Sequence, residues 1–279
     1  GKEYIPAQGV VSSGDYITEV NHQKIEGKKQ LMDLVEHLDG EKVLLTVRRE
    51  NTILEKKLTP VQISKGNYRL GIWVRDNVQG LGTITFLTKN NRFAALGHGI
   101  HDVDTSTLLT IKRGTLYRTS IQKVQKGSKG NPGTMEGIIV YNRFHRLGVI
   151  EKNTDAGIYG ELNSDRSWIG EEVPIQVAKK EEIKTGEARI RCYIDGEVKE
   201  YTICITQIDK ESDQVNKGMV IQVTDTELLE KTGGIIQGMS GSPIIQNGKL
   251  IGAVTHVFVQ DSTKGYGIFI ENMLKEEES

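Results

Sequence analysis

The chain has few of the features that tie a protein to a membrane, to nucleic acid or to a metal. No run approaches the roughly 20 consecutive apolar residues that a membrane-spanning helix requires. The 36 Lys and Arg residues almost balance the 37 Asp and Glu residues, so the formal net charge is −1, and no bulk field favours nucleic acid or an anionic membrane. The cysteines and histidines form no cluster with zinc-ligand spacing. We expect partners to be recognised through local sites, with no metal or organic cofactor.

Cysteine is scarce, with Cys192 and Cys204 on either side of a predicted hairpin turn at Asp195-Gly196. A two-residue turn there pairs Cys192 with Lys199 rather than with Cys204, so a cross-strand disulfide would need a longer loop or a bulge. We predict two buried thiols, which is compatible with either redox compartment.

The chain is long enough, at 279 residues, to bury a sizeable core in one large or two smaller domains. Its composition of 37% hydrophobic and 26% charged residues is typical of a soluble globular protein. It begins neither with an initiator methionine nor with a signal peptide. We interpret it as a processed or shortened form.

The first part of the chain has the pattern of a small mixed domain. Four apolar side chains lie on one face of its predicted helix, and Gly40 ends that helix. The predicted order is strand, helix, strand, strand, at residues 14–21, 28–38, 43–48 and 53–58. Pro60 and Gly66 mark a natural boundary. We therefore divide the chain into domains of residues 1–62 and 63–279.

Beyond the boundary, short apolar segments alternate with glycine-rich turns, and the chain has 31 glycines in all. Strands every 8 to 15 residues or so, without amphipathic helices between them, favour an all-β barrel or sandwich over a parallel α/β sheet. Two six-stranded barrels would account for the number of strands. The predicted strands are residues 70–74, 82–87, 93–96, 108–111, 137–141, 147–150, 158–162, 173–177, 189–194, 200–205, 219–223, 243–246, 249–259 and 265–270.

The most informative stretch is residues 238–243, Gly-Met-Ser-Gly-Ser-Pro. A serine between small residues can present its hydroxyl and aim backbone N–H groups at one point, as an acyl-transfer nucleophile requires. Ordinary turn chemistry also accounts for these residues. The hairpin signal Asn247-Gly248 follows directly, and chymotrypsin-like peptidases have this layout, with Gly-Asp-Ser-Gly-Gly-Pro in the same place. We predict a serine peptidase with Ser240 as its nucleophile.

A serine nucleophile needs a hydrogen-bonded base, and His98 has the best setting for that role. Gly97-His98-Gly99 is a tight break after a predicted strand, which would expose the imidazole, although a capping histidine in a turn is an alternative. His256 lies in the strand after the nucleophile hairpin, where a chymotrypsin-like fold builds the wall of its specificity pocket. We therefore predict Thr255, His256 and Val257 as substrate-binding residues, with His256 as the less favoured base.

The acid that orients the histidine has three candidates. Asp102 and Asp104 are near His98 in sequence, but residues four or six positions away in a glycine-rich turn seldom reach the far ring nitrogen. Asp225 precedes Ser240 by 15 residues. Its alternative role is the N-cap of a short helix.

The first domain resembles the later two thirds of a PDZ domain. The resemblance rests on Pro6-Ala7, Gly9-Val10, Gly14 to Ile17, Val20-Asn21, the helix with Leu31 and Leu34, and Val43 to Arg48. The usual first strand and carboxylate-binding loop are not recognisable ahead of Pro6. Peptide capture by strand addition depends on that loop, so peptide binding and a scaffold role both stay open.

The chain as a whole, to about residue 274, resembles the stage IV sporulation B serine peptidases. The resemblance is carried by residues 70–76, 80–86, 94–105, 231–244 and 252–257. It implies a chymotrypsin-like double β-barrel after an α/β PDZ-like domain. It also places the catalytic residues at His98, Asp225 and Ser240. In the predicted mechanism the N–H groups of Gly238 and Ser240 hold the oxyanion.

The same resemblance implies a signalling endopeptidase of endospore-forming bacteria. Such enzymes cross the inner forespore membrane and act in the space between the two membranes. They cleave themselves and a membrane-bound regulator of an intramembrane metalloprotease, which releases a late sigma factor. Protein substrates, and no nucleic acid, are the implied partners.

Three alternatives remain at this stage. The chain could be an inactive peptidase-like binding module with a PDZ-like part, or the nucleophile could be Ser242. An esterase with a nucleophile elbow predicts Gly-X-Ser-X-Gly between a strand and a helix; here Ser242 takes the place of the second glycine, and a hairpin follows.

Overall fold

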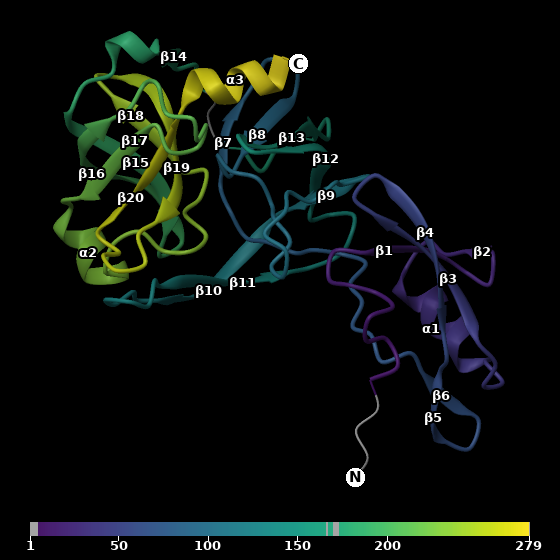
Figure 1. The fold of residues 1–279 in the computed structure, drawn as a ribbon. Coiled ribbons are helices and arrows are strands. Elements are labelled where there is room, and N and C mark those ends of the chain that lie inside the picture. The colour runs from purple at the N-terminus through teal and green to yellow at the C-terminus, as the bar shows by residue number, and fades with distance from the viewer. Residues whose placement is uncertain (1–4, 166, 170–172, 279) are drawn as a thin grey trace. The chain divides into compact units, whose positions relative to one another are not determined.

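The computed structural model describes residues 5–165, 167–169 and 173–278 (Figure 1). The chain divides into two compact units, each of which makes most of its contacts within itself. The first comprises residues 1–80 and 102–107, and the second comprises residues 81–101 and 108–279. The boundary predicted between residues 62 and 63 lies inside the first unit, and the domain assignment on either side of it stays a prediction.

The first unit is built on a four-stranded antiparallel sheet of order β2-β1-β3-β4 with one helix. Its elements are β1 (Tyr16–Val20), β2 (Gln23–Lys24), α1 (Lys28–Glu36), β3 (Val43–Arg49) and β4 (Thr52–Leu58). Val43, Leu45 and Val47 of β3 are buried, because alternate side chains of a strand point to the same face. Leu31 and Val35, four positions apart on α1, join the same core.

The predicted order of strand, helix, strand and strand is therefore confirmed for the first unit. The structure adds the short strand β2 and a hairpin of β5 (Val61–Ser64) and β6 (Asn67–Arg69). The PDZ-like assignment of this unit stays a prediction.

The second unit begins with a five-stranded antiparallel sheet of order β7-β8-β13-β12-β9. Its strands are β7 (Ile84–Leu87), β8 (Arg92–Ala95), β9 (Gly114–Tyr117), β12 (Arg146–Thr154) and β13 (Gly157–Leu162). Phe93, Leu147, Ile158 and Leu162 form its buried face. A separate hairpin consists of β10 (Thr119–Gln125) and β11 (Thr134–Ile139).

The rest of the second unit is a closed six-stranded antiparallel barrel, drawn from green to yellow in Figure 1. The strands pair in the order β15-β16-β17-β20-β19-β18, and β18 pairs back onto β15. They are β15 (Gly186–Ile194), β16 (Glu197–Ile208), β17 (Met219–Val223), β18 (Pro243–Gln246), β19 (Lys249–Val257) and β20 (Lys264–Phe269). The remaining elements are β14 (Gln176–Val177), which runs parallel to β19, the short 3-10 helix η1 (Lys180–Glu182), and the helices α2 (Thr226–Thr232) and α3 (Ile270–Glu278).

The mainly β architecture is confirmed, while the expected strand count of the first barrel is corrected. Within the described residues, the first sheet has five strands, and its edge strands β7 and β9 do not pair with each other. The strand predicted at residues 108–111 contributes only a single bridge, between His101 and Leu108. This segment is held by a side chain instead of a neighbouring strand. The Asn153 side-chain amide donates to the carbonyls of Ile100 and Leu109. A side chain thus replaces part of the ladder that a sixth strand would form.

The two predicted hairpin turns of the barrel are confirmed. Asn247 and Gly248 have φ of 52° and 75°, as a two-residue turn of the primed type requires. Asp195 and Gly196 have φ of 54° and 87°.

The second of these turns sets the register of the cysteines. Cys192 lies opposite Lys199, as predicted, and Cys204 lies opposite Glu187. Both thiols are free, with Cys192 buried and Cys204 only half-buried.

The described residues contain neither a helix that could span a membrane nor a cluster that could hold a metal ion. None of the helices there combines the length and the apolar character needed to cross a bilayer. Nor does any group of three or more His, Cys, Asp or Glu side chains in that part of the chain have a geometry that could hold a metal ion.

Candidate active site

Ser240 lies in a tight turn that leads into β18. Gly238 and Gly241, on either side of Met239 and Ser240, have φ of 106° and 93°, a region that glycine adopts far more readily than other residues. The N–H of Ser242 donates to the Met239 carbonyl at 2.9 Å. The Met239 side chain is fully buried. It anchors the turn in the barrel core, while Ser240 stays half-buried.

The segment before β7 locks this turn against the end of β8. The Thr83 N–H donates to the Ser240 carbonyl at 2.8 Å, its hydroxyl donates to the Gly238 carbonyl at 3.2 Å, and its carbonyl accepts from the Leu96 N–H at 3.2 Å. A Cβ on Gly241 would lie 2.0 Å from the Thr83 carbonyl oxygen and 2.6 Å from the Leu96 nitrogen. Only glycine fits there. Since the predicted base follows Leu96 by two residues, this packing brings the base and the nucleophile to the same place.

Some backbone N–H groups of the turn donate to a carbonyl of the protein, and others have no acceptor within the described residues. The Met239 N–H donates to the Ile236 carbonyl at 3.1 Å. Within the described residues, the N–H groups of Gly238 and Ser240 have no acceptor. An oxyanion hole needs two free donors of this kind in the turn of the nucleophilic serine.

His98 is presented by a sharp bend at the end of β8. Leu96 and Gly97 both have left-handed backbone angles, with φ of 70° and 69°. The Nδ1 atom of His98 lies 2.9 Å from the Gly99 carbonyl oxygen, and Nδ1 of His101 lies 3.1 Å from the same oxygen. Because a carbonyl oxygen only accepts hydrogen bonds, Nδ1 of His98 carries the proton. The lone pair is therefore on Nε2, which is the tautomer that a general base requires.

Burial lowers the pKa of His98 below its usual 6.5, the Gly99 carbonyl opposes that shift, and the charge of His101 adds to it. The base must be unprotonated to act, so a lowered pKa extends activity to more acidic pH. We expect the acid limb of the pH profile, measured as the rate of fluorophosphonate labelling, to have its midpoint below pH 6.5. A midpoint at or above 6.5 would contradict a buried base at His98.

The Ser240 hydroxyl donates to the Thr255 carbonyl at 2.8 Å. In this state its proton is not directed at His98. Catalytic hydrogen bonds are commonly unformed without substrate, and rotation about one side-chain bond of Ser240 frees the hydroxyl. The Thr255 side chain is itself buried, with its hydroxyl donating to the Asn216 carbonyl at 2.8 Å.

His256 packs against His98, with ring centroids 4.6 Å apart and an interplanar angle of 36°. Its Nδ1 atom is buried and has no hydrogen-bond partner within the described residues. Burial, and then the charges of His98, Lys217 and His101, lowers the pKa of His256 to about 4. His256 is therefore a neutral imidazole at neutral pH. Of the three predicted substrate-binding residues, His256 and Val257 are half-buried and Thr255 is fully buried.

Asp225 has the capping role that the sequence left open. One carboxylate oxygen accepts from the Leu228 N–H at 3.1 Å, at the start of α2, and the other accepts from the Thr202 N–H of β16 at 3.2 Å. Burial, and secondarily the charge of Asp225, raises the pKa of the Cys192 thiol to about 12. Among the described residues, the Asp225 carboxylate has no hydrogen bond or ion pair with a histidine.

The other two acid candidates are engaged in their own turn. The Asp102 carboxylate accepts from the N–H groups of Asp104 and Thr105 at 3.0 and 2.9 Å. Arg75 forms ion pairs with Asp102 and Asp104 at 3.5 and 2.8 Å. Both carboxylates are thus paired with Arg75 within the first unit.

Ser242, the alternative nucleophile, is fully buried. Its hydroxyl oxygen has no partner within the described residues, and its backbone is paired on both sides, with the carbonyl of Met239 and the N–H of Val254. A substrate carbonyl could not reach it without opening the barrel. The geometry therefore favours Ser240.

Comparison with known protein families identifies the chain. A family described as SpoIVB peptidase S55 matches residues 66–274. The chain belongs to this family. It is therefore a serine peptidase, as the resemblance of its motifs predicted, and the S55 match includes Ser240, His98 and Asp225.

More distant similarities accompany the S55 match. A putative zinc metalloprotease from Helicobacter pylori strain J99 is 34% identical over 83 residues, which cover 26% of this chain and 23% of that protein. The chain thus spans less than a quarter of that relative's length.

Two solved structures are also similar. The inactive form of the Rv3671c protease aligns with 71% of this chain and 84% of its own, at 14% identity and a TM-score of 0.39. The active form, from M. tuberculosis, aligns with 55% and 76%, at 12% identity and a TM-score of 0.33. Scores this low do not define a shared fold, so the S55 peptidase fold rests on the strand pairings given above.

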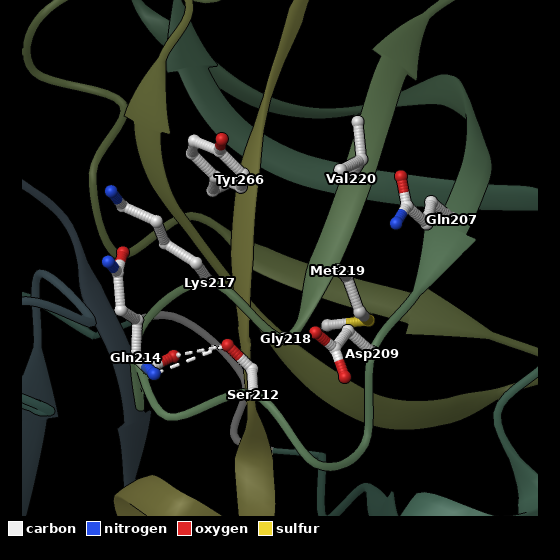
Figure 2. A pocket seen from close by; sticks show the side chains of 9 residues that line it. All are labelled: Gln207, Asp209, Ser212, Gln214, Lys217, Gly218, Met219, Val220 and Tyr266. Carbon is white, nitrogen blue, oxygen red and sulfur yellow. Dashed lines mark hydrogen bonds between the residues drawn. The ribbon is translucent and has the colours of Figure 1, made fainter.

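Figure 2 shows a hollow of about 240 Å³ on the barrel of this S55 peptidase. Gln207, Asp209, Lys217 and Tyr266 line it, with residues of the loop between β16 and β17. The Lys217 ammonium lies 5.1 Å from the Tyr266 ring centroid. None of the predicted catalytic or substrate-binding residues lines this hollow, and no pattern in the sequence indicated it.

Two further groups in the S55 active site were missed by sequence reasoning. The Gly99 carbonyl sets the His98 tautomer, and Thr83 ties the nucleophile turn to β8. The Gly-His-Gly bend was a signal for the first, because a glycine backbone can approach a ring closely. Nothing in the local pattern around Thr83 indicates the second.

Proposed function

We propose that this S55 peptidase cleaves peptide bonds by acyl transfer, with Ser240 as nucleophile and His98 as general base. The observation that carries the proposal is the pair of N–H groups at Gly238 and Ser240, which lie in the nucleophile turn and lack acceptors within the described residues. Preorganised donors of this kind stabilise the charge that develops on the substrate oxygen. The tautomer of His98, with its lone pair on Nε2, supports the same assignment.

In the proposed reaction the Ser240 hydroxyl leaves the Thr255 carbonyl, gives its proton to Nε2 of His98 and bonds to the scissile carbonyl carbon. The carbonyl oxygen becomes an oxyanion and accepts from the N–H groups of Gly238 and Ser240. His98 then donates its proton to the leaving amine as the C–N bond breaks. Water attacks the resulting ester by the same route, which releases the acid and restores Ser240.

In this mechanism Asp225 has a structural role and takes no part in the chemistry. To orient His98 directly it would have to give up its bonds to Leu228 and Thr202. The Gly99 carbonyl already fixes the tautomer that a triad acid normally fixes. We therefore assign the chemistry to Ser240 and His98, and assign Asp225 to the start of α2 and its junction with β16.

The biological role that we propose follows from family membership and from the motifs that resemble stage IV sporulation B peptidases. The substrates are the chain itself and a membrane-associated regulator of an intramembrane metalloprotease, cleaved in the space between the forespore membranes. Cleavage activates processing of a late sigma factor. The PDZ-like first unit recruits peptides or serves as a scaffold.

A fluorophosphonate probe tests the chemistry against the alternative of an inactive binding module. It phosphonylates a serine, with loss of fluoride, only where a base and an oxyanion hole activate that serine. We expect the wild type and Ser242→Ala to label, and Ser240→Ala and His98→Ala not to label. Peptide mapping of the adduct should place it on Ser240. A folded wild type that stays unlabelled, or an adduct on Ser242, would refute the assignment.

A further inference from the structure

We propose that His256 is a positioning residue for the general base: its ring packs on one face of His98 and, with the Gly99 carbonyl, holds that imidazole in its catalytic orientation. This inference rests on the proposed function of Ser240 and His98. The sequence predicted His256 as a substrate-binding residue; the contact with His98 points instead to a role in orienting the base.

The first step is the way His98 is held. Its Nδ1–H is tied to the Gly99 carbonyl at 2.9 Å, which fixes one edge of the ring. One hydrogen bond leaves the ring free to rock about that bond. The His256 ring, with its centroid 4.6 Å away, blocks that motion on one face.

The second step is the way His256 itself is held. It lies on β19 immediately after Thr255, whose side chain is buried and whose hydroxyl donates to the Asn216 carbonyl. The position of His256 is therefore set by the barrel wall. The same Thr255 carries the carbonyl that accepts from Ser240, so one short segment contacts both members of the catalytic pair.

The charge state of His256 also suits a residue that covers the base. The titratable groups beside His98 are His101, which shares the Gly99 carbonyl and whose charge lowers the pKa of His98, and His256, which packs against its ring. Lys217, from the loop between β16 and β17, and His101 influence His256 in turn. Burial lowers the pKa of His256 to about 4. The ring that covers His98 is thus uncharged at neutral pH, and it shields His98 from water without repelling the imidazolium that forms during catalysis.

Two substitutions separate ring packing from other roles. His256→Ala removes the cover, so water reaches His98 and its pKa should rise toward 6.5. We expect the acid limb of fluorophosphonate labelling to move to higher pH in His256→Ala, and the plateau rate to fall by about 10- to 100-fold as the base loses its orientation. His256→Phe keeps a ring of similar size and should retain the position of the limb and most of the rate. His37→Ala, at an exposed position of the first unit, is the matched control and should change neither.

A second readout does not depend on activity. In Ser240→Ala protein, the His98 ring protons can be titrated by NMR, and contacts between the two rings give cross-ring NOEs. We expect those NOEs, and a His98 midpoint that rises with His256→Ala but not with Asp225→Asn. Three results would overturn the role of His256. They are the absence of NOEs between the two rings, a His98 midpoint that does not move in His256→Ala, and a His98 midpoint that moves only in Asp225→Asn. If the titration behaves as expected but no variant labels, the proposed peptidase chemistry fails and the packing role stands.

Discussion

Replacing His98 with alanine should lower kcat/KM for peptide hydrolysis by about 10⁴- to 10⁶-fold, the range that follows loss of a catalytic histidine or serine in serine peptidases. A serine hydroxyl is a poor nucleophile without a base, and His98 is the base that the bend at the end of β8 presents beside the Ser240 turn. The oxyanion donors at Gly238 and Ser240 remain in the variant, so a residual rate above that of water should persist. Initial rates on a fluorogenic peptide library, with wild type and variant at equal concentration, measure the effect.

His101→Ala is the informative control for this experiment. His101 bonds to the same Gly99 carbonyl, but its side chain is more exposed, and its Nε2 lies 3.6 Å from the Asp155 carboxylate. If it were the base, its replacement would be as damaging as that of His98. We expect a loss of less than about 10-fold for His101→Ala, because only a neighbour of the catalytic ring is altered. Circular dichroism should show both variants folded. Equal losses in the two variants would contradict His98 as the base.

The sequence predicted those features of the molecule that depend on neighbouring residues alone. Asn-Gly and Asp-Gly specify their hairpin turns through the backbone angles that those residues accept, and both turns formed at the expected residues. The helix of the first unit and the closed barrel likewise follow from hydrophobic periodicity. The Ser240 turn was also recognisable, because small residues with positive φ cluster around one hydroxyl.

Features that depend on distant parts of the chain were not predictable. Thr83 and Gly241 are 158 positions apart, yet a Cβ at Gly241 would nearly touch the Thr83 carbonyl. No single-sequence pattern reports such a contact. The packing of His256 on His98 is hidden for the same reason.

Asp225 shows a different limit of sequence reasoning. A carboxylate ahead of Leu228 is compatible both with capping a helix and with orienting a histidine. The two roles differ only in where the carboxylate points. In the structure both oxygens accept from backbone N–H groups, of Leu228 and Thr202.

Gly241→Ala should be the most damaging single-methyl substitution near the site. The new Cβ would overlap the Thr83 carbonyl and the Leu96 nitrogen, and both are backbone atoms that cannot swing aside. The residue also has φ of 93°, which strains any non-glycine residue. Strain and overpacking together should lower the free energy of unfolding by about 3 kcal/mol or more, which lowers Tm by roughly 10 °C for a chain of this size. Thermal denaturation of the purified variant measures it.

Gly248→Ala separates the two causes, because Gly248 has φ of 75° but nothing within 4 Å of a new Cβ. It carries strain without a clash, so its Tm should fall by only a few degrees and its labelling rate should match wild type. Gly241→Ala should also lose labelling by about 100-fold or more, since displacement of the Thr83 segment moves Ser240 relative to His98. If the two variants lose equal stability and both label normally, Thr83 does not lock the nucleophile turn, and the alignment of Ser240 with His98 must arise within the turn itself.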